Sequence, residues 1–174
     1  MTDFTHLNHR GEAQMVDVTA KEPTIRAARA SGLVHCSPQV LTALREGSVP
    51  KGDVFAVARI AGINAAKKCA DLLPLAHVIG VHGVQVSLTV IEGGVQIEAT
   101  VRTADRTGVE MEALTAVSVA ALAVVDMVKG MDRCTSLAQI RLEAKDGGRS
   151  GPWRRPGAGT GDDGTGDDGS GEQP

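Results

Sequence analysis

Two runs of alternating apolar and polar residues flank the glycine pair Gly93-Gly94. The apolar residues are Val84, Val86, Leu88 and Val90 before the pair, and Val95, Ile97, Ala99 and Val101 after it. A period of two is typical of strands with one buried face, and paired glycines favour a two-residue turn. With Gly93-Gly94 as the turn, Val90 faces Ile97 and Val86 faces Val101, so both apolar sets share one face. The sequence therefore predicts an antiparallel hairpin with this register.

Three other segments have helical patterns, and we expect helices over Ser37–Arg45, Asp53–Asp71 and Glu110–Lys129. The first begins at a Ser-Pro pair, which suits a helix start, and Gly47 is a suitable stop. Pro74 ends the second. The third is apolar on so many sides that it must be buried on more than one face, and we expect its second face to contact another subunit.

Two further segments complete the expected fold. Residues 24–36 are ambiguous, because their alanine content favours a helix while the spacing of Ile25, Ala27 and Val34 also suits a strand. Ala138–Ala144 alternates again and predicts a last strand. If residues 24–36 form the first strand, the order is strand, helices, hairpin, helix, strand. That order predicts an α+β sandwich of ferredoxin-like type, an antiparallel sheet with helices packed on one face.

The chain of 174 residues has the length of a single domain with terminal extensions. We expect an arm over residues 1–20, a folded domain over 21–151 and a disordered tail over 152–174. Residues 156–174 carry five acidic residues and no basic one, so the other residues hold 16 acidic and 18 basic side chains. The net charge of −3 therefore comes from the tail. A segment this polar lacks the apolar surface that would offset the entropy of ordering it.

Composition sets several classes of protein aside. Aromatic residues make up 2% of the chain, which argues against a nucleic-acid binder that stacks bases on aromatic side chains. The three cysteines form no CxxC pair, and the polar N-terminus has no signal-peptide pattern, so we expect a reduced, cytoplasmic protein. The uncharged stretch Ala113–Val125 is shorter than the ~20 residues that a membrane span needs.

Known catalytic signatures are absent: the chain has no phosphate-loop GxxxxGK[ST], no GxGxxG after a predicted strand and no GxSxG. No metal site is predicted either, because the HxxH pair His6 and His9 has no third ligand nearby. The loop 146–151 suits either an anion-binding nest of backbone amides or a simple hinge to the tail.

Several ionisable residues have both a structural and a functional interpretation. His77 follows Pro74 in an apolar segment, where a hydrogen-bonded structural histidine is the usual case and a site residue on a connection is the alternative. Lys51 is either a solvated loop lysine or a phosphate or acid/base group near a helix start. Glu110 and Glu112 stand where a helix dipole favours acids.

Asp126 and Lys129 are three residues apart on one expected helix, as in an ordinary ion pair. An aspartate after thirteen uncharged residues also suits a lysine tuned for proton transfer. Glu112 and Asp126 are fourteen residues apart, or ~21 Å along a helix. One compact ligand is too short to span that distance on one chain. A site that uses both Glu112 and Asp126 would therefore be completed by a neighbouring protomer.

These clusters occur in four segments of the chain: GEAQMVDVTAK, KGDVFAVARIAGINAAKKCADLLPLAH, TGVEMEALTAVSVAALAVVDMVK and RLEAKDGGRSG. The four segments resemble the MoaC family of molybdenum-cofactor biosynthesis, the cyclic pyranopterin monophosphate synthases. The resemblance runs from about residue 5 to residue 151. It implies a ferredoxin-like sandwich whose dimers assemble into a hexamer, a trimer of dimers, with sites at subunit interfaces.

The implied reaction converts a 3′,8-cyclo-7,8-dihydroguanosine 5′-triphosphate into cyclic pyranopterin monophosphate and releases pyrophosphate. Proton transfers next to a triphosphate call for lysines, a histidine and carboxylates rather than a redox cofactor, and a need for Mg²⁺ is left open. By resemblance, the catalytic residues are Asp126, Lys129 and Lys51. The substrate-binding residues are Leu75, Ala76, His77, Met111, Glu112 with Glu110 beside it, and Arg26.

The chain departs from the family pattern at one place, where LPLAHV stands for the usual LPLCHP. Cysteine is thus not needed at Ala76, and the segment lacks its usual proline at Val78. A ferredoxin-like fold also suits a non-catalytic ligand sensor or a structural assembly subunit. A sensor would leave the cyclic precursor unchanged, and a structural subunit would tolerate alanine at every one of these charged positions.

Overall fold

The computed structural model describes residues 7–157, which form five strands and four helices. In chain order these are β1 (Thr24–His35), α1 (Pro38–Glu46), α2 (Val54–Ala66), α3 (Cys69–Leu72), β2 (Gly83–Ile91), β3 (Gly94–Asp105), α4 (Glu110–Val128), β4 (Ser136–Asp146) and β5 (Trp153–Arg154). The ambiguous segment 24–36 thus forms a strand, β1, up to His35. It lies at the centre of the sheet, where it pairs with β3 on one side and β4 on the other.

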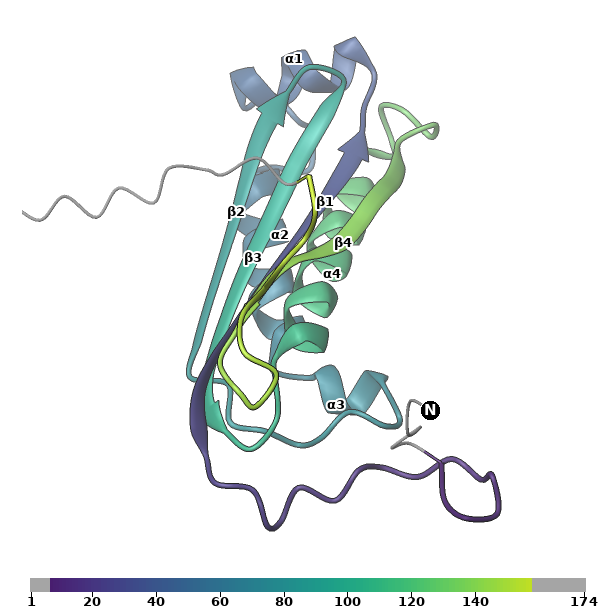
Figure 1. Cartoon of the computed structure of the whole chain (residues 1–174). Coiled ribbons are helices and arrows are strands. Elements are labelled where there is room, and N and C mark those ends of the chain that lie inside the picture. Colours follow the sequence, from purple (N-terminus) through teal and green to yellow (C-terminus); the bar gives the residue numbers. More distant parts are fainter. Residues whose placement is uncertain (1–6, 158–174) are drawn as a thin grey trace, which may run out of the picture.

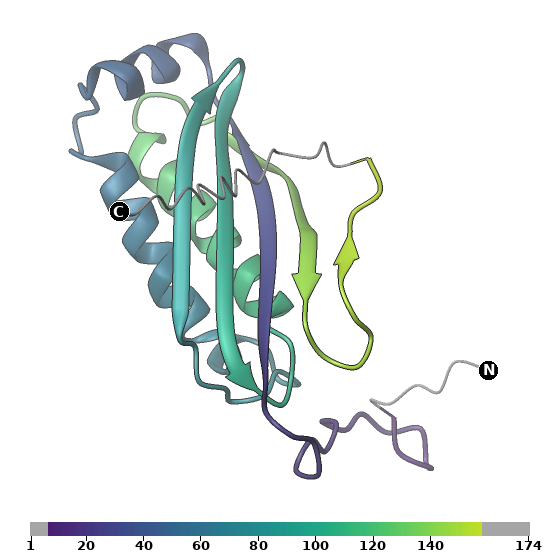
Figure 2. The same cartoon turned by 60° about the vertical axis from the view of Figure 1, so that its left-hand side comes forward.

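All strand pairs are antiparallel, in the order β2-β3-β1-β4-β5. The helices α2 and α4 pack together on one face of this sheet (Figure 1), and the view in Figure 2 shows the opposite face without a helix. The first four strands in this order, with crossovers through helices, are the arrangement of a ferredoxin-like sandwich. The predicted α+β fold is confirmed.

The hairpin of β2 and β3 forms, but the register expected for it was wrong. Val90 pairs with Val95 rather than with Ile97, so the turn is Glu92-Gly93. Gly93 has a φ of +76°, which suits the left-handed turn position. Gly94 belongs to the strand, where a Cβ atom would overlap the Val34 carbonyl oxygen of β1. The error shifts the pairing by two residues, so the same side chains still share one face.

The helix expected over Asp53–Asp71 is two helices. Asp53 is the N-cap of α2 and accepts a hydrogen bond from the Ala56 amide at 2.9 Å. The helix ends at Ala66, and α3 begins at Cys69. Cys69 stays buried, with its Sγ 3.6 Å from Thr115 Oγ1 of α4. Because Cys69 is buried, the apolar pattern of α2 continues into α3. Periodicity alone therefore did not reveal the break between the two helices.

Helix α4 is buried on two faces, as its composition predicted. One face packs on β1, β3 and β4, and another packs on α2 of the same chain. The second buried face is thus covered by α2, and the expected contact of α4 with another subunit stays a prediction. By length and hydropathy α4 would also pass as a membrane span, but half of it is buried inside this fold, as in the core helix of a soluble protein.

Strand β5 lies in a segment that the composition assigned to the tail. Trp153 pairs with Lys145 and Arg154 with Ala144, so the sheet continues beyond residue 151. A strand of two residues is too short to have a recognisable period. The expected disorder of residues 158–174 lies outside the described residues, as does His6.

Candidate functional site

The three predicted catalytic residues meet at the C-terminal end of α4, and we call them the lysine–aspartate cluster: Lys51, Asp126 and Lys129. The Nζ atom of Lys129 lies 2.7 Å from Asp126 Oδ1, and that of Lys51 lies 3.3 Å from the same oxygen. Lys51 also donates to the Asp126 backbone carbonyl at 2.6 Å. It reaches them from the turn before α2, where Gly52 has a φ of +96°.

Hydrogen bonds from Lys129 and Lys51, and the charges of both lysines, hold the pKa of Asp126 below its usual range. The carboxylate is therefore ionised at neutral pH and keeps two ammonium groups beside it. All three side chains are 45–58% exposed. The cluster can thus present two cations to an anionic ligand that approaches from outside the chain.

The predicted substrate-binding residues other than Arg26 lie at the opposite end of α4, where they line one cavity of about 440 Å³: Leu75, Ala76, His77, Glu110, Met111 and Glu112. The first three come from the connection after α3, and the others from the first turn of α4. We call this space the histidine–glutamate cavity. Its volume suits a nucleotide-sized or smaller ligand.

His77 is held by the N-terminal arm. Its Nε2 lies 2.6 Å from the carbonyl oxygen of Val16, so this nitrogen is protonated and donates. Val16, Asp17 and Val18 line the same cavity. Residues of the arm expected over residues 1–20 thus form one wall of the cavity, a role that their weak periodicity did not indicate.

Glu112 is the buried acid of this cavity, with 4% of its surface exposed. Burial raises its pKa, and the charge of Glu110 acts in the same direction. A carboxyl group with a raised pKa is suited to donate or exchange a proton near neutral pH. Glu110 itself forms an ion pair with Lys145 of β4 at 3.5 Å.

Arg26 lies at the start of β1 and donates to the carbonyl oxygens of Asp105, at 3.0 Å, and Arg106, at 3.1 Å. It lines a second cavity of about 660 Å³ together with Lys21 and Arg149. Lys21 and Arg149 also line the histidine–glutamate cavity, so the two cavities adjoin. Three basic residues thus line this second cavity against one acidic residue, Glu22, and we call it the basic cavity.

Lys21 and Lys145 were missed by the sequence analysis, which singled out neither. Lys21 lies in the arm, where no periodicity marks a position. Lys145 alternates with apolar residues in β4 and gave no sign that it faces α4. Arg149, by contrast, belongs to the loop 146–151, for which an anion nest had been one of two interpretations, and Gly147 and Gly148 there both have positive φ.

The lysine–aspartate cluster and the histidine–glutamate cavity do not meet in one chain. Glu112 and Asp126 belong to the same continuous helix, which puts them ~21 Å apart along its axis. The span expected from the sequence is thus confirmed. Among residues 7–157, no group of three or more His, Cys, Asp or Glu side chains is placed to hold a metal ion.

Comparison with known proteins gives a family and named relatives. The model of the MoaC family matches residues 15–148. A protein of Streptomyces griseus named cyclic pyranopterin monophosphate synthase is 58% identical over 152 residues, 87% of this chain and 86% of that protein. Cyclic pyranopterin monophosphate synthase 1 of Mycobacterium tuberculosis is 55% identical over 153 residues, covering 87% and 90%. A cyclic pyranopterin monophosphate synthase of Pelobacter propionicus is 50% identical over 155 residues, which are 88% of this chain and 97% of that protein.

Proposed function

This chain belongs to the MoaC family, and we propose on that premise that it is a cyclic pyranopterin monophosphate synthase of molybdenum-cofactor biosynthesis. It converts (8S)-3′,8-cyclo-7,8-dihydroguanosine 5′-triphosphate into cyclic pyranopterin monophosphate and pyrophosphate. The observation that carries the proposal is the identity of 50–58% to synthases over 87–88% of the chain. The two groups of ionisable residues are the chemistry that such a reaction needs.

The last part of the reaction defines what the site must supply. A hydroxyl oxygen of the substrate forms a bond to the α-phosphorus, the bond from that phosphorus to the β-phosphate oxygen breaks, and pyrophosphate leaves. The hydroxyl proton passes to a base, and the charge that grows on the leaving group needs cations. Ring opening and rebuilding need further proton transfers. Carboxylates, lysines and a histidine provide these, and the proposal requires no redox cofactor. Mg²⁺ with the triphosphate is compatible with it.

We assign acid/base work and triphosphate contacts to Lys51 and Lys129, with Asp126 orienting both. The close contacts of the two ammonium groups with Asp126 support this assignment. The histidine–glutamate cavity would hold the ring system, with the protonated Nε2 of His77 and the buried Glu112 as its polar groups. The chain has Ala76 and Val78 where the family usually has cysteine and proline, and His77 and Glu112 keep their positions with these two residues.

The two halves of the site would come from different protomers in a cytoplasmic homohexamer. The ~21 Å between Glu112 and Asp126 along α4 supports a shared site, since one compact ligand cannot reach both in one chain. Val57 and Ile60 of α2 are 44% and 60% exposed, and Leu122 of α4 is 56% exposed, which suits further contacts of these helices.

The activity is tested by incubating the chain with the cyclic precursor and measuring pyrophosphate release together with the mass of the product. Stoichiometric pyrophosphate and the mass of the cyclic monophosphate are expected. Unchanged precursor would favour a ligand sensor, and unchanged turnover after alanine replacement of Lys51, Lys129 and Glu112 would favour a structural subunit.

The shared site is tested by mixing two inactive variants, one from each half. In Lys51→Ala mixed with His77→Ala, random pairing at equal amounts gives about a quarter of the sites both intact halves, so activity should partly return. Lys51→Ala mixed with Lys129→Ala is the matched control, because both changes lie in the same cluster and no site becomes intact. No recovery in the first mixture, despite measured subunit exchange, would contradict the shared site.

A further inference from the structure

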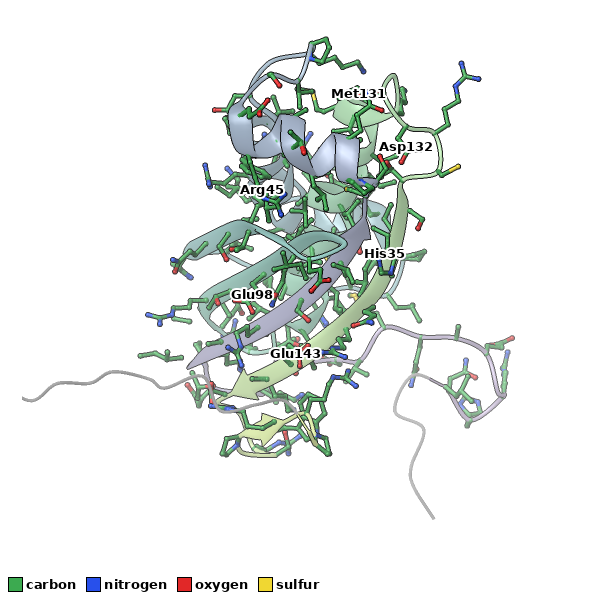
Figure 3. All side chains as sticks on the ribbon, turned by 90° about the horizontal axis from the view of Figure 1, so that it is seen from above. His35, Arg45, Glu98, Met131, Asp132 and Glu143 are labelled. Carbon is green, nitrogen blue, oxygen red and sulfur yellow. The ribbon has the colours of Figure 1, made fainter. Side chains whose placement is uncertain are left out.

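Glu143 of β4, labelled in Figure 3, is a buried carboxylate. It lines neither the histidine–glutamate cavity nor the basic cavity. Its side chain is 7% exposed. The Oε1 atom accepts hydrogen bonds from Ser31 Oγ of β1 and from Arg141 Nε, the latter at 2.6 Å. The Oε2 atom is the only buried side-chain polar atom without a hydrogen-bond partner in residues 7–157. A buried carboxylate oxygen in this state depends on a nearby cation for its stability.

Arg155 supplies that cation from the far side of the β4–β5 hairpin. Its Nε lies 3.7 Å from Glu143 Oε2 and donates to the Leu142 carbonyl at 2.7 Å. Its backbone amide donates to the Glu143 carbonyl at 2.8 Å. The guanidinium carbon lies 5.9 Å from the centre of the Trp153 ring, a cation–π distance. Arg155, the residue directly after β5, thus contacts both Leu142 and Glu143 of β4.

The Arg155 contacts hold the hairpin between β4 and β5 together with the Arg154–Asp146 ion pair at 2.9 Å and the hydrogen bond from Lys145 Nζ to Ser150 Oγ at 2.8 Å. Strand β5 has two residues, so its ladder contributes few hydrogen bonds to keep the return arm of the hairpin in place. The loop carries Arg149, which lines both the basic cavity and the histidine–glutamate cavity. Lys21 of the arm lines the same two cavities. The position of Arg149 therefore depends on both ends of the hairpin being fixed.

We propose that Glu143 is a positioning residue which, through Arg155, holds the β4–β5 loop so that Arg149 and Lys21 bind the phosphate chain of the ligand where the histidine–glutamate cavity adjoins the basic cavity. Lys51 and Lys129 of a neighbouring protomer would contact the same phosphate chain, as proposed above. The proposal rests on the function proposed above for the identity of the ligand. Arg149 and Lys21 act as the binding groups, and Glu143 and Arg155 act only on the geometry of the loop. Guanidinium and ammonium groups facing one cavity are the chemistry that recognises a polyphosphate.

The test measures two quantities for each variant: the dissociation constant for inorganic tripolyphosphate by calorimetry, and kcat and KM for the cyclic precursor. Arg149→Ala removes a charged hydrogen-bond donor and should weaken tripolyphosphate binding about 10-fold or more. Glu143→Gln keeps the shape of the side chain and removes its charge, and Arg155→Gln removes the cation. Both should weaken binding and raise KM by about 3- to 10-fold, with kcat within about twofold of wild type.

Two further variants separate positioning from a general loss of structure. Arg155→Lys keeps the charge and should recover part of the affinity lost in Arg155→Gln. The double variant Arg149→Ala/Arg155→Gln should bind no more weakly than Arg149→Ala alone, since both changes act through one contact. Arg45→Gln on α1 is the charge control and should behave as wild type. All constants are measured well below each variant's melting temperature.

The outcomes distinguish this proposal from the proposed function. Wild-type turnover of the precursor with unchanged affinities in Glu143→Gln and Arg155→Gln would overturn the positioning role and leave the enzymatic function intact. Additive losses in the double variant would also overturn it. A wild-type chain that leaves the precursor unchanged would refute the enzymatic function, while the tripolyphosphate constants would still decide whether the loop is positioned by Glu143.

Discussion

The Nζ atom of Lys51 lies 2.6 Å from the backbone carbonyl oxygen of Asp126 and 3.3 Å from its carboxylate. This contact joins the turn before α2 to the last turn of α4. Lys129 approaches the same carboxylate at 2.7 Å, so one aspartate holds two ammonium groups in fixed directions. Because all three side chains are exposed, the arrangement stabilises the fold little and is available to a ligand.

Replacing Lys51 by methionine should therefore reduce activity far more than stability. Loss of an acid/base group in the proposed reaction is expected to lower kcat by about 10²- to 10⁴-fold. The midpoint of urea unfolding should change little, since exposed ion pairs contribute little. Arg133→Met is the matched control. Arg133 is an exposed cation shortly after the end of α4, and it makes no ion pair within residues 7–157. An equal loss of activity in both variants would indicate a general charge effect rather than a role of Lys51.

Replacing Glu112 by glutamine should change how stability depends on pH. The pKa of Glu112 is raised by burial, so between its unfolded value, near 4.5, and its folded value the folded state binds more protons than the unfolded state. The stability of the wild type therefore falls as pH rises through that interval. Glutamine carries no titrating proton and lacks this loss. The variant should gain stability relative to wild type as pH rises above 4.5 and show no such gain below it.

Urea unfolding at a series of pH values between 4 and 8 checks this expectation. Glu46→Gln is the control, because Glu46 is an exposed carboxylate at the end of α1 and makes no ion pair within residues 7–157. If the stability difference between wild type and Glu112→Gln were the same at every pH, the carboxyl group would not be titrating differently in the two states.

The fold was largely predictable because its strongest signals are local. Alternation on both sides of a glycine pair determines which side chains share a face, and that part of the hairpin was correct. The choice between turns could not be made locally, since either glycine suits a turn. It is decided by Val34 of β1, whose carbonyl leaves no room for a Cβ atom at Gly94. The break in the helix before Cys69 was hidden in the same way, by a packing contact with Thr115.

The candidate site was predictable in its residue types and in its division into two halves. Glu112 and Asp126 lie on one helix, so their separation follows from the helical rise alone. The walls of the cavities come from the arm and from the β4–β5 loop, which have no periodic pattern. Val16 reaches His77 and Arg149 reaches the cavity only through the folded chain. Such contacts between irregular segments leave no local signature in a sequence.

The three cysteines should differ strongly in their reactivity. Burial raises the pKa of Cys36 to about 11, with the charge of Asp132 acting in the same direction, and burial also raises the pKa of Cys69. Few of these thiols are ionised at pH 8, and the thiolate is the reactive form. Cys134 is exposed. Iodoacetamide at pH 8 should thus label Cys134 first, as followed by peptide mass spectrometry. Cys134→Ser should remove the fast phase, and a fast phase that persists in this variant would mean that the other two thiols are open to solvent.

Helices α2 and α4 should move apart if Gly62 acquires a side chain. A Cβ atom at this position of α2 would lie 2.9 Å from the Ala116 carbonyl oxygen and 3.2 Å from the Ala120 Cβ, both on α4. The backbone oxygen cannot move aside, so Gly62→Ala should overpack the crossing and lower the free energy of unfolding by about 1–3 kcal/mol, despite the better helix propensity of alanine.

Gly130→Ala is the matched control for this change, because its Cβ would meet nothing within 4 Å and its φ is not positive. Its stability should stay within about 0.5 kcal/mol of wild type. Since α4 carries both halves of the candidate site, a shift of this helix should also lower turnover in Gly62→Ala at temperatures where the protein stays folded. Equal unfolding midpoints for the two alanine variants would mean that α2 and α4 are not in close contact at Gly62.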